Sequence, residues 1–423
     1  MGALFGTDGV RGIANIELTP ELAFDLGRAG SCVLASQSGG FKPRILVGKD
    51  TRISCDMLEA ALIAGICSTG ADVLTAGIIP TPAVAYLTRK YQASCGIVIS
   101  ASHNPVEDNG IKFFGFNGYK LPDETEDIIE ELVLKGTSDL IRPQGPEVGR
   151  AYTIEEAKRN YIDYLLGCID LQDGMSGYTI VLDCANGASY EVAPQLWQQL
   201  GAKVIPINNV PNGININDCC GSTHTESLKR AVVDNQADIG IAYDGDADRC
   251  IIVDELGNEL DGDYQLVICA LEMQRLGKLD PARVVATVMS NIGLDIALQK
   301  ENIQVVSCKV GDRYVLEKMQ ETGGKIGGEQ SGHIIFLDHA TTGDGLLTSL
   351  KVAEVLKHTG KKLSELAGQM GKQPQILVNV RMENKDEVLA LPYIKQVLKE
   401  AEEKLGKQGK LVVRPSGTEP LVR

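Results

Sequence analysis

Three stretches of this sequence repeat one order of apolar and polar segments, and this repeat limits the accessible folds more than any other feature. Each stretch begins with a short apolar run, continues with a helical pattern and a second apolar run, and ends with a further strand-like run that leads into a polar loop, although the pattern is weaker in the third stretch. Short β-branched runs that alternate with helices of about ten residues indicate βαβ units and largely parallel sheets. We therefore predict an α/β fold whose polar loops lie beyond the carboxyl ends of the strands, where ligands bind.

The predicted order within each stretch is strand, helix, strand and strand. These elements cover 44–48, 57–68, 72–76 and 95–99, then 178–183, 192–200, 203–207 and 238–243, and finally 283–288, 294–300, 304–308 and 324–327. A linker with two glycines and a proline at 367–374 precedes a shorter fourth segment, with a strand predicted at 375–382, an amphipathic helix at 391–405 and a strand at 410–413. The expected domains are 1–153, 154–257, 258–370 and 371–423.

The charge and cysteine content exclude several classes of protein. The chain carries 41 basic and 56 acidic residues, a formal net charge of −15, which argues against a nucleic-acid or anionic-membrane partner. Eleven cysteines occur without any C-x-x-C spacing, as is typical of reduced thiols in the cytosol. The sequence shows no charged-then-apolar leader and no apolar run of about 18 residues, so we expect a cytoplasmic protein that does not span a membrane.

The loop at 244–249 reads DGDADR and carries the strongest chemical signal. The carboxylates of Asp244, Asp246 and Asp248 alternate along the chain after an apolar strand and would repel one another unless a cation lay among them. Hard oxygen ligands suit Mg²⁺, particularly when phosphate oxygens complete its coordination, and Arg249 can bind the same phosphate. A calcium hand also opens with D-x-D-x-D, but its sixth position needs glycine where this chain has Arg249. A solvated acidic turn is the other alternative.

The loop at 100–105 reads SASHNP and offers a nucleophile. A small hydroxyl residue on a tight turn at a strand end, Ser102, is well placed to act as an exposed nucleophile. A turn predicted at Asn109 and Gly110 would fold Lys112 back over this serine. An ordinary Ser/Asn/Pro turn and a solvated lysine are the alternatives.

Two further loops offer groups for a phosphorylated sugar. The third loop has glycines that allow close backbone approach and polar groups fit for sugar hydroxyls, namely Glu329, Ser331 and His333. The last loop combines hydroxyls, an amide and arginines in a cradle for a phosphate dianion, formed by Arg414, Ser416, Gly417, Thr418 and Arg423. Either segment alone could be an ordinary surface turn. Together with the first two loops they predict phosphoryl exchange on a phosphosugar.

These motifs resemble the α-D-phosphohexomutase superfamily along the whole chain. The matching segments are 5–12, 100–105, 244–249, 311–314, 328–333 and 414–420. The opening segment, 215–217, 220–224 and Gln330 resemble the glucosamine branch, since phosphomannomutase/phosphoglucomutase relatives typically carry Met at the position of Gln330. The sequence stops at Arg423, where the family usually continues with a final strand and tail.

The resemblance implies an α/β protein with four domains around a central cleft, the first three being related mixed α/β units and the fourth a smaller α+β domain. It implies reversible conversion of glucosamine 6-phosphate to glucosamine 1-phosphate, on the route to UDP-N-acetylglucosamine and the cell wall. The implied cofactors are Mg²⁺ and a sugar bisphosphate activator, either glucosamine 1,6-bisphosphate or glucose 1,6-bisphosphate. The expected partner is the phosphosugar substrate, and we allow for a homodimer.

The same resemblance assigns expected roles to single residues. Ser102 would be carried as phosphoserine, and one of its oxygens would bind Mg²⁺ together with Asp244, Asp246 and Asp248. Proton transfer and charge around the serine would fall to Lys112, His103, Arg11 and Arg249. Glu329 and Ser331 would hold sugar hydroxyls, and His333 would assist at the other proton transfer. The loop at 414–418 with Arg423 would hold the non-reacting phosphate.

Three other functions compete with this reading. A phosphomannomutase/phosphoglucomutase would need the same machinery with another sugar. A phosphosugar-binding protein without catalysis would be favoured by loss of Ser102 or of a metal aspartate, and both are present. A phosphatase would hydrolyse the serine ester, and it has no need of a second phosphate anchor.

Overall fold

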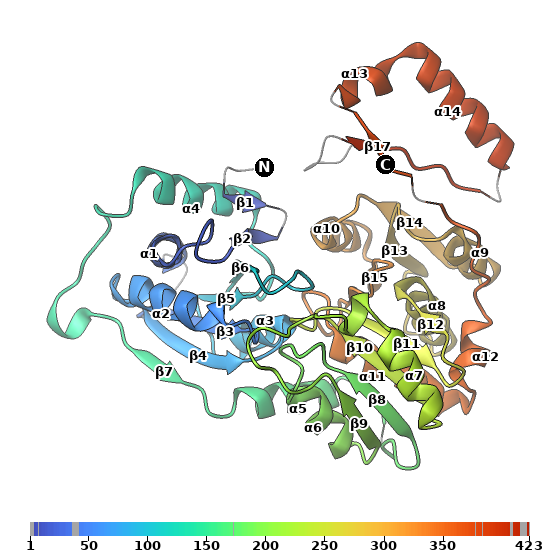
Figure 1. Cartoon of the computed structure of the whole chain (residues 1–423), viewed down its shortest axis with the longest axis horizontal. Coiled ribbons are helices and arrows are strands. Elements are labelled where there is room, and N and C mark those ends of the chain that lie inside the picture. Colours follow the sequence, from blue (N-terminus) through green and yellow to red (C-terminus); the bar gives the residue numbers. More distant parts are fainter. Residues whose placement is uncertain are drawn as a thin grey trace.

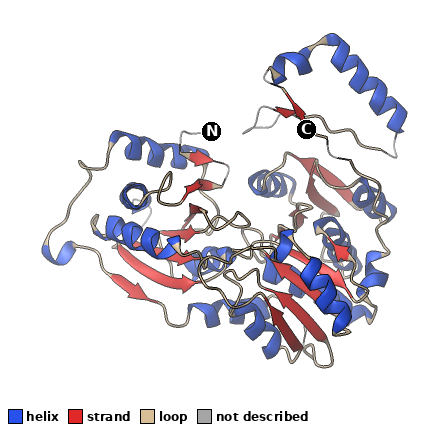
Figure 2. Cartoon of the chain, viewed as in Figure 1, coloured by secondary structure: helices blue, strands red, loops and turns tan. Residues whose placement is uncertain are grey.

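The chain folds into three sheet-containing units that sit side by side and a fourth, smaller unit that stands apart from them (Figure 1). The computed structural model describes residues 4–6, 8–35, 42–171, 173–376, 378–382, 384–406, 409–414 and 421–422. Helices lie on both faces of the sheets, as Figure 2 shows. Within the described part of the chain, no helix has the length and apolar character needed to cross a bilayer.

The first unit has the strand order β1-β2-β6-β5-β3-β4-β7. Its strands are β1 (Phe5–Gly6), β2 (Gly9–Ile13), β3 (Arg44–Lys49), β4 (Asp72–Ile78), β5 (Cys95–Ile99), β6 (Asp108–Gly115) and β7 (Ala151–Thr153). Its helices are α1 (Pro20–Ala35), α2 (Ser54–Cys67), α3 (Thr81–Lys90) and α4 (Asp123–Lys135). Because side chains alternate across a strand, Ile45 and Val47 of β3 join the core under α1 and α2, whereas Leu46 joins the core that contains α3.

The second unit has the strand order β12-β11-β10-β8-β9. Its elements are α5 (Ala157–Gly167), β8 (Thr179–Asp183), α6 (Val192–Gln199), β9 (Lys203–Ile207), α7 (Glu226–Asp234), β10 (Ile239–Tyr243), β11 (Cys250–Asp254) and β12 (Glu259–Leu260). Short 3₁₀ helices occur at Gly145–Glu147 and Gly221–Thr223.

The third unit has the strand order β14-β13-β15-β16. Its elements are α8 (Gly262–Arg275), β13 (Arg283–Thr287), α9 (Ile292–Lys300), β14 (Gln304–Cys308), α10 (Asp312–Thr322), β15 (Ile326–Gly328), β16 (Ile334–Phe336), α11 (Gly345–Thr359) and α12 (Leu363–Ala367).

One four-strand arrangement recurs in all three sheets, as the repeat predicts. The equivalent orders are β6-β5-β3-β4, β11-β10-β8-β9 and β16-β15-β13-β14. In each case the first three strands along the chain are parallel and the fourth runs antiparallel. The predicted strands and helices of these units differ from the observed ones by a few residues at most. The sequence predicts a fourth strand only in the second unit, at 250–253, where β11 confirms it; its antiparallel direction and the fourth strands of the other two units were not predicted. This strand turns each polar loop into a hairpin connection at the carboxyl end of a parallel strand.

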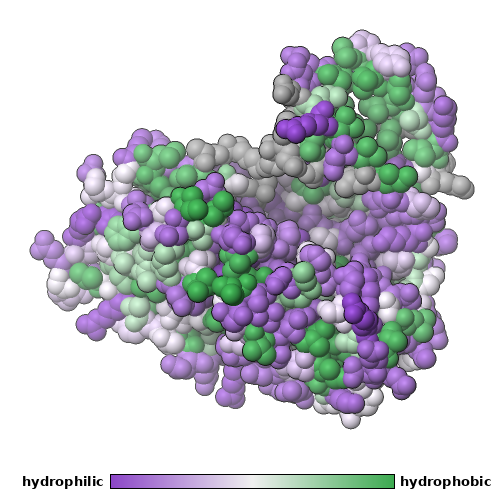
Figure 3. Space-filling view, in the orientation of Figure 1, coloured by the Kyte–Doolittle hydropathy of each residue, from purple (hydrophilic) through white to green (hydrophobic). Residues whose placement is uncertain are grey.

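The fourth unit agrees less well with the sequence prediction. The helix predicted at 391–405 is α14 (Pro392–Leu405), preceded by α13 (Lys385–Ala390). Among the described residues of the strand predicted at 375–382, only β17 (Val380–Arg381) is a strand, and 410–413 forms none. A β-strand is stabilised by hydrogen bonds to a neighbouring strand. Here that pairing is short and joins β17 to β18 (Leu421–Val422). Figure 3 shows apolar side chains gathered on this unit, where the exposed ones include Ile376, Val378, Leu391, Tyr393 and Val397.

A single apolar core connects the three larger units. It contains Val84 of α3, Trp197 of α6 and Leu350 of α11, all fully buried. Within it, Tyr161 of α5 donates a hydrogen bond of 2.8 Å to Asp344 Oδ2 at the start of α11. This shared core holds the three hairpin loops in a defined arrangement.

Glycine allows α1 and α2 to approach closely, which gives a test of the packing. A Cβ on Gly65 of α2 would lie 2.2 Å from the carbonyl oxygen of Phe24, whereas a Cβ on Gly167 of α5 would meet nothing within 4 Å. We expect Gly65→Ala to lower the free energy of unfolding by about 1–3 kcal/mol through overpacking. Gly167→Ala should change it by less than about 1 kcal/mol, towards stabilisation. Chemical denaturation of both variants measures the difference, and equal midpoints would contradict the close packing.

Candidate active site

The three aspartates of 244–249 converge in the hairpin between β10 and β11. Asp244, Asp246 and Asp248 are buried, and each offers an oxygen within 4.8 Å of the others. Among the described residues, Asp246 Oδ1 and Asp248 Oδ1 are buried without a hydrogen-bond partner. Buried carboxylate oxygens without partners are costly unless a cation binds them. The arrangement therefore fits a divalent cation with hard oxygen ligands.

The charges of these carboxyls differ because their neighbours differ. Burial and the adjacent Asp248 and Asp246 raise the pKa of Asp244 well above its usual value. Burial also opposes the charged form of Asp248, but His333, Lys112 and Arg249 hold its pKa below the usual value. A bound cation would relieve the repulsion that raises the pKa of Asp244.

Ser102 lies directly against this cluster. It follows β5 with a left-handed backbone (φ 53°), and its Oγ donates a 2.6 Å hydrogen bond to Asp244 Oδ2. The His103 Nδ1 atom is 3.3 Å from the same hydroxyl. Burial and the positive charge of Arg249 lower the pKa of His103 to about 4, so its ring is neutral at neutral pH. The hydroxyl predicted as a nucleophile and the predicted metal ligands therefore share one site.

Lys112 reaches the cluster from a strand rather than from a turn. The prediction of a turn at Asn109 and Gly110 is wrong, because both lie in β6, which pairs antiparallel with β2 and β5. That pairing places Lys112 Nζ 2.8 Å from Asp246 Oδ2 and 3.1 Å from Asp8 Oδ2. Burial opposes the charge of Lys112, but Asp246 and Asp8 raise its pKa above the usual value.

Two arginines border the same cluster. Arg11 of β2 pairs with Asp8, and Arg249 Nε lies 3.8 Å from Asp248 Oδ1. The Nε atoms of both arginines are buried without a hydrogen-bond partner in the described part of the chain. Donors of this kind suit the oxygens of a phosphate.

The third loop lies between β15 and β16 and packs on the second. Gly332 approaches the start of β11, since a Cβ there would lie 2.1 Å from the Cys250 carbonyl oxygen. Glu329 Oε1 accepts a 3.0 Å hydrogen bond from the Gly311 amide, and Ser331 Oγ has no hydrogen-bond partner among the described residues. The third predicted residue, His333, is buried with its Nδ1 atom 3.4 Å from Asp248 Oδ2.

His333 is positioned by groups on both sides of its ring. The Gly343 amide donates a 3.1 Å hydrogen bond to Nε2, and Asp312 Oδ2 lies 3.7 Å from the same nitrogen. Burial opposes a charged imidazole, but Asp248 and Asp312 raise the pKa of His333. His333 therefore connects the second loop to the third unit.

The last loop is described only in part. Arg414 lines a cavity of about 300 Å³ together with residues of 288–292 and 373–376. Ser102 and the three aspartates do not line this cavity. Ser416, Gly417, Thr418 and Arg423 lie outside the described residues.

Sequence reasoning missed several polar groups of the site. Thr81, the first residue of α3, donates a 2.7 Å hydrogen bond to Asp246 Oδ2. Lys120 pairs with both Asp8 and Asp312. The matching segments 5–12 and 311–314 contain the two aspartates, whereas no local pattern singles out Thr81 or Lys120.

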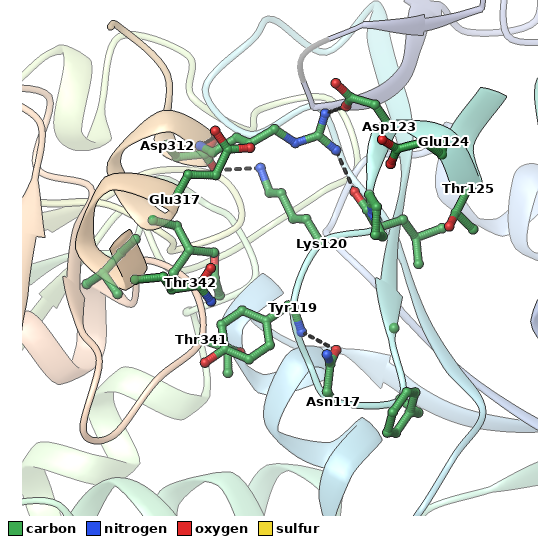
Figure 4. Close-up of a pocket in the computed structure, with 18 of the residues that line it drawn as sticks. Asn117, Tyr119, Lys120, Asp123, Glu124, Thr125, Asp312, Glu317, Thr341 and Thr342 are labelled. Atoms are coloured by element: carbon green, nitrogen blue, oxygen red, sulfur yellow. Dashed lines mark hydrogen bonds and ion pairs between the residues drawn. The ribbon is translucent and has the colours of Figure 1, made fainter. Parts of the chain in front are cut away.

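A cavity of about 540 Å³ adjoins this network between the first and third units. Figure 4 shows Lys120 and Asp312 reaching towards each other across it from their two units. Arg313 beside them pairs with Asp123 and Glu126 of α4. The cavity meets the aspartate cluster through His333, which lines it.

Comparison with known proteins identifies relatives along the full length of the chain. Models described as phosphoglucomutase/phosphomannomutase match in four parts: domain I at 2–139, domain II at 159–257, domain III at 261–373 and the C-terminal domain at 377–423. The phosphoglucosamine mutase of Syntrophomonas wolfei is 72% identical over all of this chain and 94% of its own length. The phosphoglucosamine mutase of Desulforamulus reducens is 57% identical over the same shares.

A solved structure agrees in fold. A phosphoglucomutase/phosphomannomutase family protein from Burkholderia thailandensis superposes with a TM-score of 0.77 and 23% identity, covering 98% of this chain and 91% of that one.

The unpartnered carboxylate oxygens predict measurable metal binding. We expect Mg²⁺ to bind the wild-type chain, and Asp246→Asn to weaken the affinity by at least about tenfold, because it removes one negative charge from a site whose attraction is mainly ionic. Isothermal titration calorimetry measures the affinity without any assumption about catalysis. Asp218→Asn, at an exposed aspartate of the same unit, is the matched control and should bind as wild type does. Unchanged affinity in Asp246→Asn would show that the cluster is not the metal site.

Proposed function

Because this chain belongs to the phosphoglucomutase/phosphomannomutase family, we propose that it interconverts glucosamine 6-phosphate and glucosamine 1-phosphate through a phosphoserine at Ser102. The observation that carries this proposal is the 2.6 Å contact of Ser102 Oγ with a cluster of three buried carboxylates. The sugar is proposed from the relatives at 72% and 57% identity, which are phosphoglucosamine mutases. The product would feed the synthesis of UDP-N-acetylglucosamine.

Two phosphoryl transfers complete the proposed reaction. In the first, the bond between phosphorus and Ser102 Oγ breaks, a bond to the free sugar hydroxyl forms, and the hydroxyl proton leaves to a base. The sugar bisphosphate then turns around in the cleft. In the second transfer, the bond between its other phosphorus and the sugar oxygen breaks, a bond to Ser102 Oγ forms, the serine proton leaves to a base, and the departing sugar oxygen takes up a proton. Free enzyme is thus recovered in the phosphorylated form, and a sugar bisphosphate activator, glucosamine 1,6-bisphosphate or glucose 1,6-bisphosphate, restores that form when the phosphate is lost.

The residues around Ser102 are suited to manage charge during transfer. Lys112 is held protonated by Asp246 and Asp8, so it can donate a proton or a hydrogen bond to Ser102 Oγ as the bond to phosphorus breaks. The unpartnered donors of Arg11 and Arg249 would bind the oxygens of the transferring group. Neutral His103 would complete this set as a hydrogen-bonding group beside the hydroxyl.

Asp244, Asp246 and Asp248 would hold Mg²⁺ together with a phosphoserine oxygen. Bound Mg²⁺ would neutralise part of the charge on the transferring phosphoryl group. Asp246 Oδ2 accepts from Thr81 and Lys112, which leaves Oδ1 for the cation.

The remaining predicted residues would bind the rest of the substrate. Glu329 and Ser331 would hold sugar hydroxyls, and Ser331 Oγ has no competing partner among the described residues. His333 would assist at the proton transfer on the sugar. Arg414, with Ser416, Gly417, Thr418 and Arg423, would hold the phosphate that does not react.

The proposal extends to domain limits and cellular location. We place the boundaries near 153, 257 and 370. The first of these lies between the family models matched at 2–139 and 159–257. A cytoplasmic location suits the eleven cysteines, all of which are unpaired. A second candidate, phosphomannomutase/phosphoglucomutase, would use the same Ser102 and aspartates with another sugar.

Ser102 gives a direct test of the phosphoryl carrier. Peptide mass spectrometry on protein purified from cells should find phosphate on Ser102. Ser102→Ala should lose this phosphate and at least about a hundredfold in rate, because a covalent step is removed. Ser138→Ala, at an exposed serine, should keep full activity. A Ser102→Ala enzyme with a rate near that of wild type would exclude the phosphoserine route.

The preferred sugar is a separate test. A 2-amino group carries one unit of charge that a 2-hydroxyl lacks, and a nearby carboxylate such as Glu329 can favour it by about 1–3 kcal/mol in a partly desolvated cleft. We expect kcat/KM for glucosamine 6-phosphate to exceed that for glucose 6-phosphate by at least about tenfold. Both are measured with Mg²⁺ and the same bisphosphate. Preference for glucose or mannose phosphates would keep the phosphoserine chemistry and favour the second candidate.

A further inference from the structure

The loop that carries Ser102 has a strained backbone that requires support. Ser102 has a φ of 53°, a left-handed conformation that costs a non-glycine residue free energy unless its surroundings enforce it. This backbone directs Ser102 Oγ at Asp244. The groups that enforce it therefore control how the hydroxyl meets the aspartate cluster.

Arg52, which follows β3, binds this loop from within the first unit. Its guanidinium is buried and donates hydrogen bonds of 3.0 Å to the Ser102 carbonyl and 2.9 Å to the Asn104 carbonyl. It also donates to the carbonyls of Pro105 and Asp108. Five donors in a planar fork suit this set of acceptors, whereas lysine could not reproduce it.

The charge of Arg52 is balanced inside the same cluster. Asp50 Oδ2 accepts a 2.9 Å hydrogen bond from Arg52 Nε. The same oxygen accepts a 2.6 Å hydrogen bond from Ser100 Oγ, and Ser100 Oγ accepts one of 3.0 Å from the Ser102 amide. The buried ion pair is thus tied to both ends of the loop.

Asn217 binds the loop from the second unit. Its side-chain amide nitrogen donates a hydrogen bond of 2.8 Å to the Ser102 carbonyl and one of 3.1 Å to the Asn104 carbonyl. Both amide hydrogens are used, and the Ser102 carbonyl accepts from Asn217 and Arg52, which satisfies its two lone pairs. Asn217 itself has a φ of 57°, which asparagine tolerates better than most residues.

Other contacts show that the two units meet closely at this loop. A Cβ on Gly245, between two of the aspartates, would lie 2.5 Å from the Ser102 carbonyl oxygen and 2.9 Å from Asn217 Nδ2. Thr51 Oγ1 donates a hydrogen bond of 2.6 Å to the Asn186 carbonyl, and the Ile53 amide donates one of 2.8 Å to the Gly213 carbonyl. The segment around Arg52 is therefore attached to both units.

We propose that Arg52 and Asn217 are positioning residues that hold the Ser102 carbonyl from two units and thereby aim Ser102 Oγ at the aspartate cluster. This inference rests on the proposed phosphoryl transfer for its effect on rate. Neither side chain contacts Ser102 Oγ, so both act through the backbone. Loss of the Asn217 amide should misdirect the hydroxyl and leave sugar binding intact.

A glycine substitution tests Asn217 without backbone strain. Asn217→Gly removes both hydrogen bonds and accepts the left-handed backbone. Asn302→Gly is the matched control, because Asn302 also has a φ of 57° and is exposed. We expect kcat of Asn217→Gly to fall by about ten- to a hundredfold with KM within about twofold, as misplacement of a reacting group predicts. A rise in KM at unchanged kcat would assign Asn217 to substrate binding and overturn the proposal.

Hydrogen exchange separates this inference from the proposed function. Amides in peptides that cover 100–108 should exchange at least about tenfold faster in Asn217→Gly than in wild type, while Asn302→Gly leaves them unchanged. Arg52→Lys should accelerate the same peptides. If exchange in these peptides were unchanged in both Asn217→Gly and Arg52→Lys, the proposed positioning role would be refuted, whatever activity the variants showed. If the wild-type chain had no mutase activity, the proposed function would be refuted. The hydrogen-exchange comparison would still decide whether Arg52 and Asn217 hold the loop. If Asn217→Gly unfolds, Asn217→Asp, which loses both donors and keeps the shape, replaces it.

Discussion

Three buried carboxylates within 4.8 Å of one another create a repulsion that the rest of the site must balance. Each of the three larger units supplies a basic side chain to it. Lys112 comes from the first unit, Arg249 from the second and His333 from the third. Because Lys112 and the three aspartates are buried, removal of one partner would leave the others uncompensated at a high cost in free energy. The need to balance this charge therefore links the units to a common centre.

The recurring sheet explains how loops of different chemistry reach that centre. Each loop connects a parallel strand to an antiparallel neighbour, so each begins at the carboxyl end of a strand. The first loop supplies the hydroxyl, the second the carboxylates and the third a histidine and a glutamate. Close approach of the loops depends on glycines, notably Gly245 against Ser102 and Gly332 against Cys250. One backbone plan thus carries three distinct sets of side chains.

Hydrogen bonds determine which atoms of the site stay available. Thr81 and Lys112 both donate to Asp246 Oδ2, so its Oδ1 has no partner among the described residues. The backbone of Ser102 is held by Arg52 and Asn217, while its hydroxyl donates only towards Asp244 and has His103 beside it. The reactive atoms are buried but keep hydrogen-bonding or coordinating capacity for a ligand, while Asp246 Oδ2 and the Ser102 carbonyl are engaged. Preorganisation of this kind reduces the reorganisation needed during reaction.

The sequence by itself determined the repeat, three strands and one helix in each of the three larger units, and the loops with Ser102 and the aspartates, because these follow from periodicities of a few residues. It did not determine the antiparallel fourth strands, since neighbouring strands are chosen by distant pairing. Nor did it reveal Thr81, Lys120, Arg52 or the role of Asn217. Contacts such as Ser102 with Asp244, or Thr81 with Asp246, join residues more than a hundred positions apart. Only the tertiary structure decided which distant groups meet there, because no local pattern encodes the partner of a buried polar atom.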